Sequence, residues 1–247
     1  MSLSGTRIVP AEPIGDFTDF GITAFTTTRA AGSFSVASRE PVSEVMARWT
    51  ALRGSFQEVS RLATASQVHG DRILEHTSGW EGWLRGDSAD GHIARTTGIA
   101  MAVSVADCVP VFIAHPSGTA ALLHAGWRGT AAGILDRALD RLTRVGLSPS
   151  ELRLHLGPAI CGDCYEVSPD VYQRLTGRRV GAPSTVDIRA LLADRARSRG
   201  VAHVSVSQWC TRCNNDRFFS HRAGDEGRQL GVLVVPRRLV PGVLDSP

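Results

Sequence analysis

The chain of 247 residues contains 43% hydrophobic and 21% charged residues, which is the composition of an ordinary globular protein. A chain of this length buries roughly 70% of its unfolded surface, so it requires no disulfide or metal merely to fold. Its net charge is +3, from 27 basic and 24 acidic residues. This balance argues against a nucleic-acid partner or a membrane surface.

The first third of the chain predicts one strand and one helix. Residues 22–28 are rich in β-forming side chains. A helix is expected after Pro41, because apolar residues then recur at helical spacing. They are Val42, Val45, Met46, Trp49 and Leu52.

The middle of the chain predicts three buried strands, over residues 99–105, 109–114 and 119–124. His115-Pro-Ser-Gly118 predicts the turn between the second and the third. A helical stripe follows, with Thr130 as the expected N-cap. Its members are Leu135, Ala138, Leu139, Leu142 and Val145.

Two more helices and two strands are predicted toward the C-terminus. Ser168-Pro169 is expected to open a helix that Gly177 ends, and Asp187 to cap one that stops at Gly200. Residues 201–207 and 231–235 predict late strands. With no repeat or linker in sight, we expect one domain over residues 1–247, of mixed α/β class, with a mixed β-sheet core flanked by helices.

All 27 basic residues are arginine. Without lysine, the chain cannot use a lysine Schiff base or a phosphate loop of the G-x-x-x-x-G-K type. The G-x-G-x-x-G and G-x-S-x-G motifs are also absent. No two of the eight histidines stand one residue apart, so a cluster of several coppers is not expected.

The N-terminal 15 residues show no export signal, and no stretch approaches the ~20 apolar residues of a membrane span. The five cysteines are an odd number. Reduced thiols in the cytoplasm are therefore expected.

Three residues at predicted strand ends form a candidate site. They are His69, Cys108 and His124. If neighbouring strands end together, these side chains meet beside a cleft. Two imidazoles and a thiolate suit zinc and leave a fourth position open. The same residues could instead form a Cys–His nucleophilic pair, or be unrelated structural residues.

The segment His124-Ala-Gly-Trp-Arg-Gly129 joins a strand end to a predicted helix start. Free N–H groups and Arg128 would make this an anion site. An ordinary strand-to-helix turn is the alternative.

Two C-x-x-C pairs, Cys161–Cys164 and Cys210–Cys213, suggest a second, structural metal site. The 45 residues between them exceed the usual gap of roughly 15–20 in a zinc ribbon. Redox thiols, disulfides and unrelated cysteines therefore remain open alternatives.

Seven short motifs occur in the order found in one known family. They are Gln67-Val-His-Gly70, Ala89-Asp-Gly91, Ala106-Asp-Cys-Val-Pro110, His124-Ala-Gly-Trp-Arg-Gly-Thr130, Leu156-Gly-Pro-Ala-Ile160, Cys164-Tyr-Glu-Val167 and Phe218-Phe-Ser220. From Phe20 to Val235 the chain resembles the YfiH-like family, labelled polyphenol oxidases or laccase-domain proteins. Its members are understood as purine nucleoside phosphorylases with adenosine deaminase activity.

The resemblance implies a YfiH-like α/β domain and a zinc ion held by His69, Cys108 and His124. It also implies phosphorolysis of adenosine, inosine or methylthioadenosine with inorganic phosphate as co-substrate, and deamination of adenosine. We expect Asp107 to move protons or to orient a ligand histidine. A strand-end carboxylate that accepts backbone hydrogen bonds is the alternative for Asp107.

Arg29, Arg128 and Arg222 are the candidates to bind phosphate, because a guanidinium group matches phosphate geometry. The sequence departs from the family in three places. Ala30-Ala31-Gly32 replaces a glycine pair, a Leu-Asn-Leu segment is missing, and Ser220-His-Arg-Ala223 has lost one arginine.

Three alternative functions are kept. They are a cysteine hydrolase or transferase acting on peptidoglycan precursors, a copper-dependent polyphenol oxidase, and a non-catalytic metalloprotein that binds a nucleotide. The sequence leaves the oligomeric state and the preferred nucleoside open.

Overall fold

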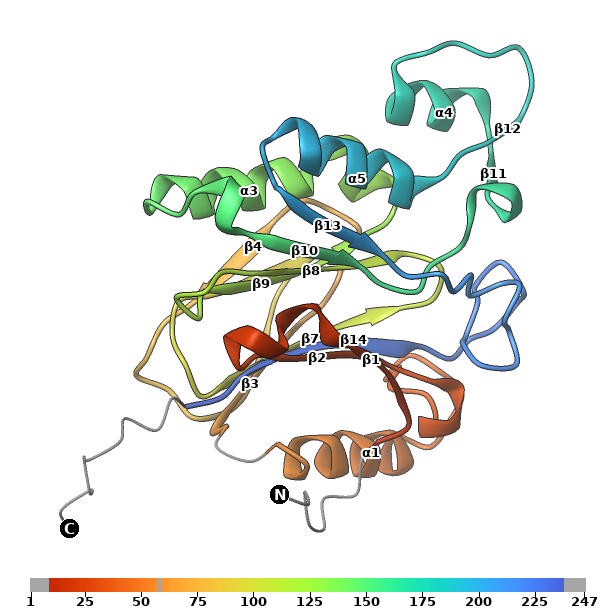
Figure 1. Cartoon of the computed structure of the whole chain (residues 1–247). Coiled ribbons are helices and arrows are strands. Elements are labelled where there is room, and N and C mark those ends of the chain that lie inside the picture. Colours follow the sequence, from red (N-terminus) through yellow and green to blue (C-terminus); the bar gives the residue numbers. More distant parts are fainter. Residues whose placement is uncertain (1–8, 57–58, 238–247) are drawn as a thin grey trace, which may run out of the picture.

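The computed structural model describes residues 9–56 and 59–237. Two six-stranded mixed sheets are stacked face to face, with helices on both outer sides (Figure 1). Apolar side chains on both faces of the central strands produce this layering, because each buried face needs a covering layer. The predicted α/β class with a mixed-sheet core flanked by helices is confirmed.

The first sheet, called sheet A, has the strand order β1-β2-β14-β7-β3-β5. Its first four strands are antiparallel neighbours, and β3 is parallel to both β7 and β5. The strands are β1 (Ala11–Ile14), β2 (Thr23–Thr27), β3 (Arg61–Ala65), β5 (Gly82–Gly86), β7 (Ile99–Val105) and β14 (Gln229–Val235).

The second sheet, called sheet B, has the order β13-β10-β8-β9-β6-β4. Only its two outermost pairs, β13·β10 and β6·β4, are parallel. The strands are β4 (Ile73–His76), β6 (Gly91–Ala94), β8 (Val109–Ala114), β9 (Ala120–Ala125), β10 (Arg153–Leu156) and β13 (His203–Val206). A separate short pair joins β11 (Glu166–Val167) and β12 (Ser184–Thr185).

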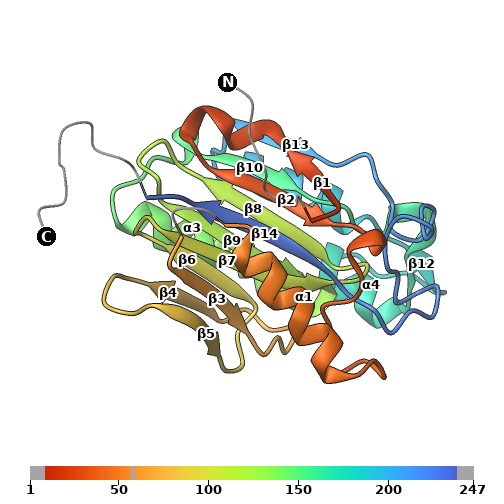
Figure 2. The same ribbon diagram turned by 90° about the horizontal axis from the view of Figure 1, so that it is seen from below.

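The core lies in three layers. Met101 and Leu233 of sheet A pack against Phe112 and Leu122 of sheet B between the two sheets. Helix α1 (Val42–Gly54) covers the outer face of sheet A, as Figure 2 shows from below. The outer face of sheet B is covered by α3 (Ile134–Arg144) and α5 (Ile188–Ser198), with α4 (Pro169–Thr176) beside them.

The predicted strands correspond to β2, β7, β8, β9, β13 and β14, and the predicted helices after Pro41, Ser168 and Asp187 to α1, α4 and α5. Ser168 and Asp187 accept capping hydrogen bonds, as expected. The prediction of Thr130 as an N-cap is wrong. Thr130 lies buried inside a separate short helix, α2 (Trp127–Ala132), which ends where Gly133 adopts φ +83°. Within the described residues, no helix combines the length and the apolar character that a transmembrane span requires.

A buried histidine pair links β4 to β6. His76 Nε2 lies 2.9 Å from His92 Nδ1, and both side chains are almost fully buried. Burial, reinforced by Arg61, lowers the pKa of His76 to about 4. Burial, reinforced by His76, lowers the pKa of His92 to about 3. Both residues are therefore held neutral in the folded protein at pH 7.

This pair predicts a loss of stability in acid. In the unfolded chain histidine titrates near pH 6.5, so between that pH and about 4 the unfolded state binds more protons. The free energy of unfolding therefore does not depend on this pair above about pH 7, and it decreases as the pH falls below 6.5. Urea unfolding should show a loss of about 2 kcal/mol per histidine between pH 7.5 and pH 5. His92→Gln should remove roughly half of this dependence, whereas the exposed His203→Gln should leave it unchanged. Parallel pH profiles for all three proteins would contradict this assignment.

Candidate active site

The candidate site lies where three connections pass from sheet A to sheet B. The segments 66–72, 87–90 and 106–108 join β3 to β4, β5 to β6 and β7 to β8. His69, Asp90 and Cys108 each lie on one of these crossings. His124 belongs to β9, which is hydrogen-bonded to β6 and β8. Residues far apart in sequence thus converge at one edge of the two sheets.

The structure brings the three predicted ligand residues together. One ligand atom from each of His69, Cys108 and His124 lies within 4.8 Å of the other two. The two imidazole rings meet edge to face, with centroids 4.8 Å apart. The imidazole groups of His69 and His124 both interact with the Cys108 thiol. His69 is exposed whereas His124 is buried, so the cluster opens on one side.

Backbone conformation helps to aim two of these segments. His69 and Asp107 adopt φ values of +59° and +76°, in the left-handed region that non-glycine residues rarely occupy. At Gly126, a Cβ atom would lie 2.9 Å from Cys108 Sγ and 3.2 Å from His69 Cδ2. The chain can therefore pass beside the cluster only because this residue has no side chain.

Asp90 fixes the positions of both histidines. Its side chain is fully buried and accepts a 2.8 Å hydrogen bond from His124 Nδ1. It also accepts the backbone N–H groups of Val68, His69 and Gly70, at 3.2, 2.9 and 2.7 Å. Because Nδ1 of His124 is occupied, Nε2 is the nitrogen left to face Cys108.

These contacts decide the charge of the cluster. Burial raises the pKa of Asp90, but the hydrogen bonds from His124 and from Gly70 outweigh burial and lower it. Burial likewise raises the pKa of Cys108, yet the positive charge of His124 lowers it to about 6. Burial lowers the pKa of His124, but the Cys108 thiolate and Asp90 raise it to about 9. The side chains alone therefore favour a thiolate beside an imidazolium at neutral pH.

Asp90 has the orienting contact that we expected of Asp107. The carboxylate of Asp107 accepts the Thr211 hydroxyl at 2.6 Å and the Arg222 backbone N–H at 2.7 Å. It therefore holds the C-terminal loop and orients no ligand histidine. The prediction that Asp107 orients a ligand histidine is therefore wrong. Its bond from a backbone N–H agrees with the alternative, a strand-end carboxylate that accepts backbone hydrogen bonds. The motif Ala89-Asp90-Gly91 was the only sequence signal for Asp90.

A cavity of about 690 Å³ opens over the cluster. This volume is within the range of small-molecule sites. Its apolar wall includes Phe34, Trp49, Trp127, Ile160 and Tyr165, and Tyr165 has its pKa raised to about 12, mainly by burial. Four arginines line the cavity against a single carboxylate, that of Asp107. The arginines are Arg85, Arg128, Arg222 and Arg228.

The three arginines expected to bind phosphate differ in their positions. Arg128 lines the cavity and stacks on the Trp127 ring at 4.4 Å, and it makes no hydrogen bond or ion pair within residues 9–56 and 59–237. Arg222 also lines the cavity, and one of its amino groups donates to the Glu166 carbonyl at 3.0 Å. Arg29 lies outside the cavity lining, because Asp225 holds it at 2.6 Å and Phe219 lies under it at 4.4 Å. We therefore do not assign Arg29 to phosphate.

The expected anion site at the start of the helix after His124 also needs revision. That helix is α2, which has only six residues, and the amphipathic helix begins later, at Ile134. Arg128 is the cationic side chain by which this segment lines the cavity.

The donors fit a metal site with one open position. Two imidazoles and one thiolate are the ligand types that zinc uses in catalytic sites, where water or substrate takes the fourth place. Together the fold and this cluster define an α/β protein with a three-donor site at the floor of a basic cavity.

Residues 27–236 match the family described as multi-copper polyphenol oxidoreductase laccase, and the chain belongs to this family. A Deinococcus radiodurans protein named purine nucleoside phosphorylase is 31% identical over 211 residues, covering 80% of this chain and 79% of that protein. A protein named adenosine deaminase, from an unknown prokaryotic organism, is 34% identical over 160 residues and covers 59% of each chain.

Solved structures share the fold. The YlmD crystal structure from Geobacillus stearothermophilus aligns with a TM-score of 0.79 and 28% identity, covering 88% of this chain and 93% of that one. The Bacillus licheniformis hypothetical protein YfiH aligns with a TM-score of 0.81 at 23% identity, covering 94% and 98%. The expected YfiH-like fold is confirmed.

The contacts of Asp90 predict a large effect of Asp90→Asn. The amide keeps the shape but removes the charge and offers donors to groups that are themselves donors. We expect the free energy of unfolding to fall by about 2–4 kcal/mol, measured by urea denaturation. The exposed Asp87→Asn is the matched control and should change it by less than about 0.5 kcal/mol. Equal stability of the two variants would show that Asp90 does not organise the site.

Proposed function

We propose that this protein is a zinc-dependent purine nucleoside phosphorylase that also deaminates adenosine. The observation that carries the proposal is the basic cavity, with aromatic walls, over the His69–Cys108–His124 cluster. Aromatic side chains can stack on the faces of a purine base. Arginines suit the phosphate co-substrate. The names of the relatives support the same two reactions.

His69, Cys108 and His124 would hold the zinc ion. When bound, it would supply Lewis acidity at the one coordination position that the protein leaves open. Asp90 keeps His124 Nδ1 protonated, so that the other nitrogen is available as a ligand. Thiolate character at Cys108 is what metal binding requires.

In phosphorolysis, a phosphate oxygen forms a bond to the anomeric carbon of the ribose while the bond from that carbon to the purine nitrogen breaks. The purine leaves with the bonding electron pair and takes up a proton. We assign Arg128 and Arg222 to orient phosphate. The protein would then accelerate phosphorolysis by positioning the reactants and by stabilising charge. Asp107 acts as a positioning residue, because it binds the Arg222 backbone.

In deamination, water adds to C6 of adenine and ammonia leaves. No arginine is required for this step. The two reactions therefore make different demands on the same cavity, which allows them to be separated by mutation.

Incubation with adenosine and with inosine, with and without phosphate, tests the proposal. Base release that requires phosphate marks phosphorolysis, and ammonia from adenosine marks deamination. Tight nucleoside binding with neither product would contradict the proposal in favour of a binding protein.

A cysteine hydrolase is the second candidate, because Cys108, His124 and Asp90 form a thiol–imidazole–carboxylate series. Cys108→Ser separates the two. If Cys108 is a ligand, this variant loses one equivalent of zinc per chain together with activity, measured by elemental analysis and product assays. His203→Gln should retain both. An inactive Cys108→Ser protein with its full zinc content would indicate covalent catalysis, and bound copper would favour the oxidase alternative.

Arg128→Gln should weaken phosphate use selectively. The loss of charge-assisted hydrogen bonds predicts a KM for phosphate raised about 10–100-fold, with deamination of adenosine retained. Arg144→Gln, at an exposed position of α3, is the control and should change neither reaction. Equal losses of both reactions in Arg128→Gln would contradict the assignment of this side chain to phosphate.

A further inference from the structure

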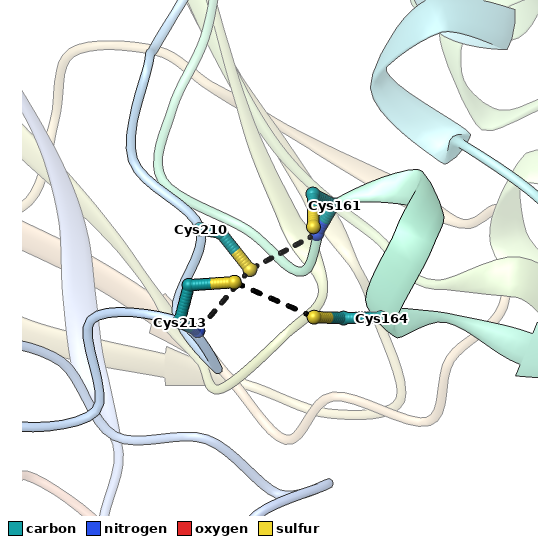
Figure 3. Close-up of side chains that lie close together, drawn as sticks. All are labelled: Cys161, Cys164, Cys210 and Cys213. Carbon is teal, nitrogen blue, oxygen red and sulfur yellow. Dashed lines mark hydrogen bonds between the residues drawn. The ribbon is translucent and has the colours of Figure 1, made fainter.

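The four remaining cysteines form a second cluster (Figure 3). The Sγ atoms of Cys161, Cys164, Cys210 and Cys213 all lie within 4.8 Å of one another. Cys164 Sγ and Cys213 Sγ are 3.5 Å apart. None of the four lines the cavity.

The fold explains how two pairs so far apart in sequence meet. The chain between them forms β11, α4, β12, α5 and β13, and β13 returns it beside β10. Just beyond these strands, Ala159 and Cys210 form a parallel β-bridge. The backbone therefore holds the two C-x-x-C turns against each other, and the length of the gap in sequence is no obstacle.

The surroundings of the sulfur atoms suit thiolates. The backbone N–H groups of Cys161 and Cys213 point at Cys210 Sγ, at 3.3 and 3.4 Å. Arg212 donates to the carbonyl of Cys164, which puts a positive charge beside the cluster. Hydrogen bonds and nearby positive charge both stabilise a metal-bound thiolate set.

We propose that Cys161, Cys164, Cys210 and Cys213 bind one structural zinc ion as four thiolates. At a Zn–S distance of about 2.3 Å, tetrahedral ligands are about 3.8 Å apart, close to the separations in this cluster. Each thiol releases its proton when its sulfur binds. With all four positions filled by protein there is no place for substrate, so the role of the ion is structural.

The zinc ion would stabilise one wall of the cavity. Tyr165 directly follows Cys164, and the guanidinium group of Arg222 lies 5.1 Å from the Tyr165 ring centroid. The loop that begins with Cys210 reaches the cavity through Thr211, which donates to Asp107. The proposed ion therefore joins the two segments that carry this wall.

Zinc content and zinc coordination test the proposal. We expect two equivalents of zinc per chain in the purified full-length protein, one in Cys108→Ser, one in Cys213→Ser and none in the double variant. Cys108→Ser and Cys213→Ser are matched controls, because each removes a single thiol from a different cluster. In Cys108→Ser, X-ray absorption at the zinc edge should show four sulfur neighbours at about 2.3 Å.

Three results would overturn the proposal. They are a Cys108→Ser protein without zinc, nitrogen or oxygen among the ligands of its remaining zinc, and disulfides among the four cysteines, detected by alkylation without reductant and mass spectrometry. If Cys213→Ser does not fold, the coordination measurement on Cys108→Ser still decides the question. His69→Ala, at an exposed position, can replace Cys108→Ser as the background.

Discussion

The crossing of the chain between two stacked sheets is the constraint on which the candidate site depends. Three connections pass from sheet A to sheet B at one edge, and each carries one of the residues His69, Asp90 and Cys108. No local segment contains this site. It exists only when both sheets are formed and stacked, so the packing that stabilises the fold also determines the distances among the donors.

Asp90 converts this convergence into a defined geometry. A single buried carboxylate accepts the His124 ring and three backbone N–H groups of the loop that carries His69. A buried charge is stable only with such compensation, and here the compensating groups are those that the site must position. Asp107, one crossing away, binds the C-terminal loop in the same manner. The two carboxylates thus position different segments around one cavity.

The sequence predicted the strands β2, β7, β8, β9, β13 and β14 and the helices α1, α4 and α5 correctly, because their signals are local. Strands β1, β3, β4, β5, β6 and β10 are only four or five residues long and were missed. The break at Gly133 was missed because a helical stripe does not reveal a single left-handed residue. His69, Cys108 and His124 could be identified from the sequence, because they are residue types that bind metals and each lies at the end of a predicted strand. The role of Asp90 could not be predicted, because a carboxylate in a turn shows its partners only in three dimensions.

Two glycines that do not line the cavity, Gly157 and Gly231, nevertheless influence the candidate site. A Cβ at Gly157 would lie 2.8 Å from Pro110, and one at Gly231 equally close, with the Phe112 ring just beyond. A methyl group at Gly231 would press sheet A against sheet B, whereas one at Gly157 would press on the neighbouring strand β8 within sheet B. Pro110 lies two residues from Cys108 and pairs directly with His124. Packing in the hydrophobic interior around Pro110 therefore helps to determine the geometry of the Cys108–His124 pair, and variation there should be judged as variation of the candidate site.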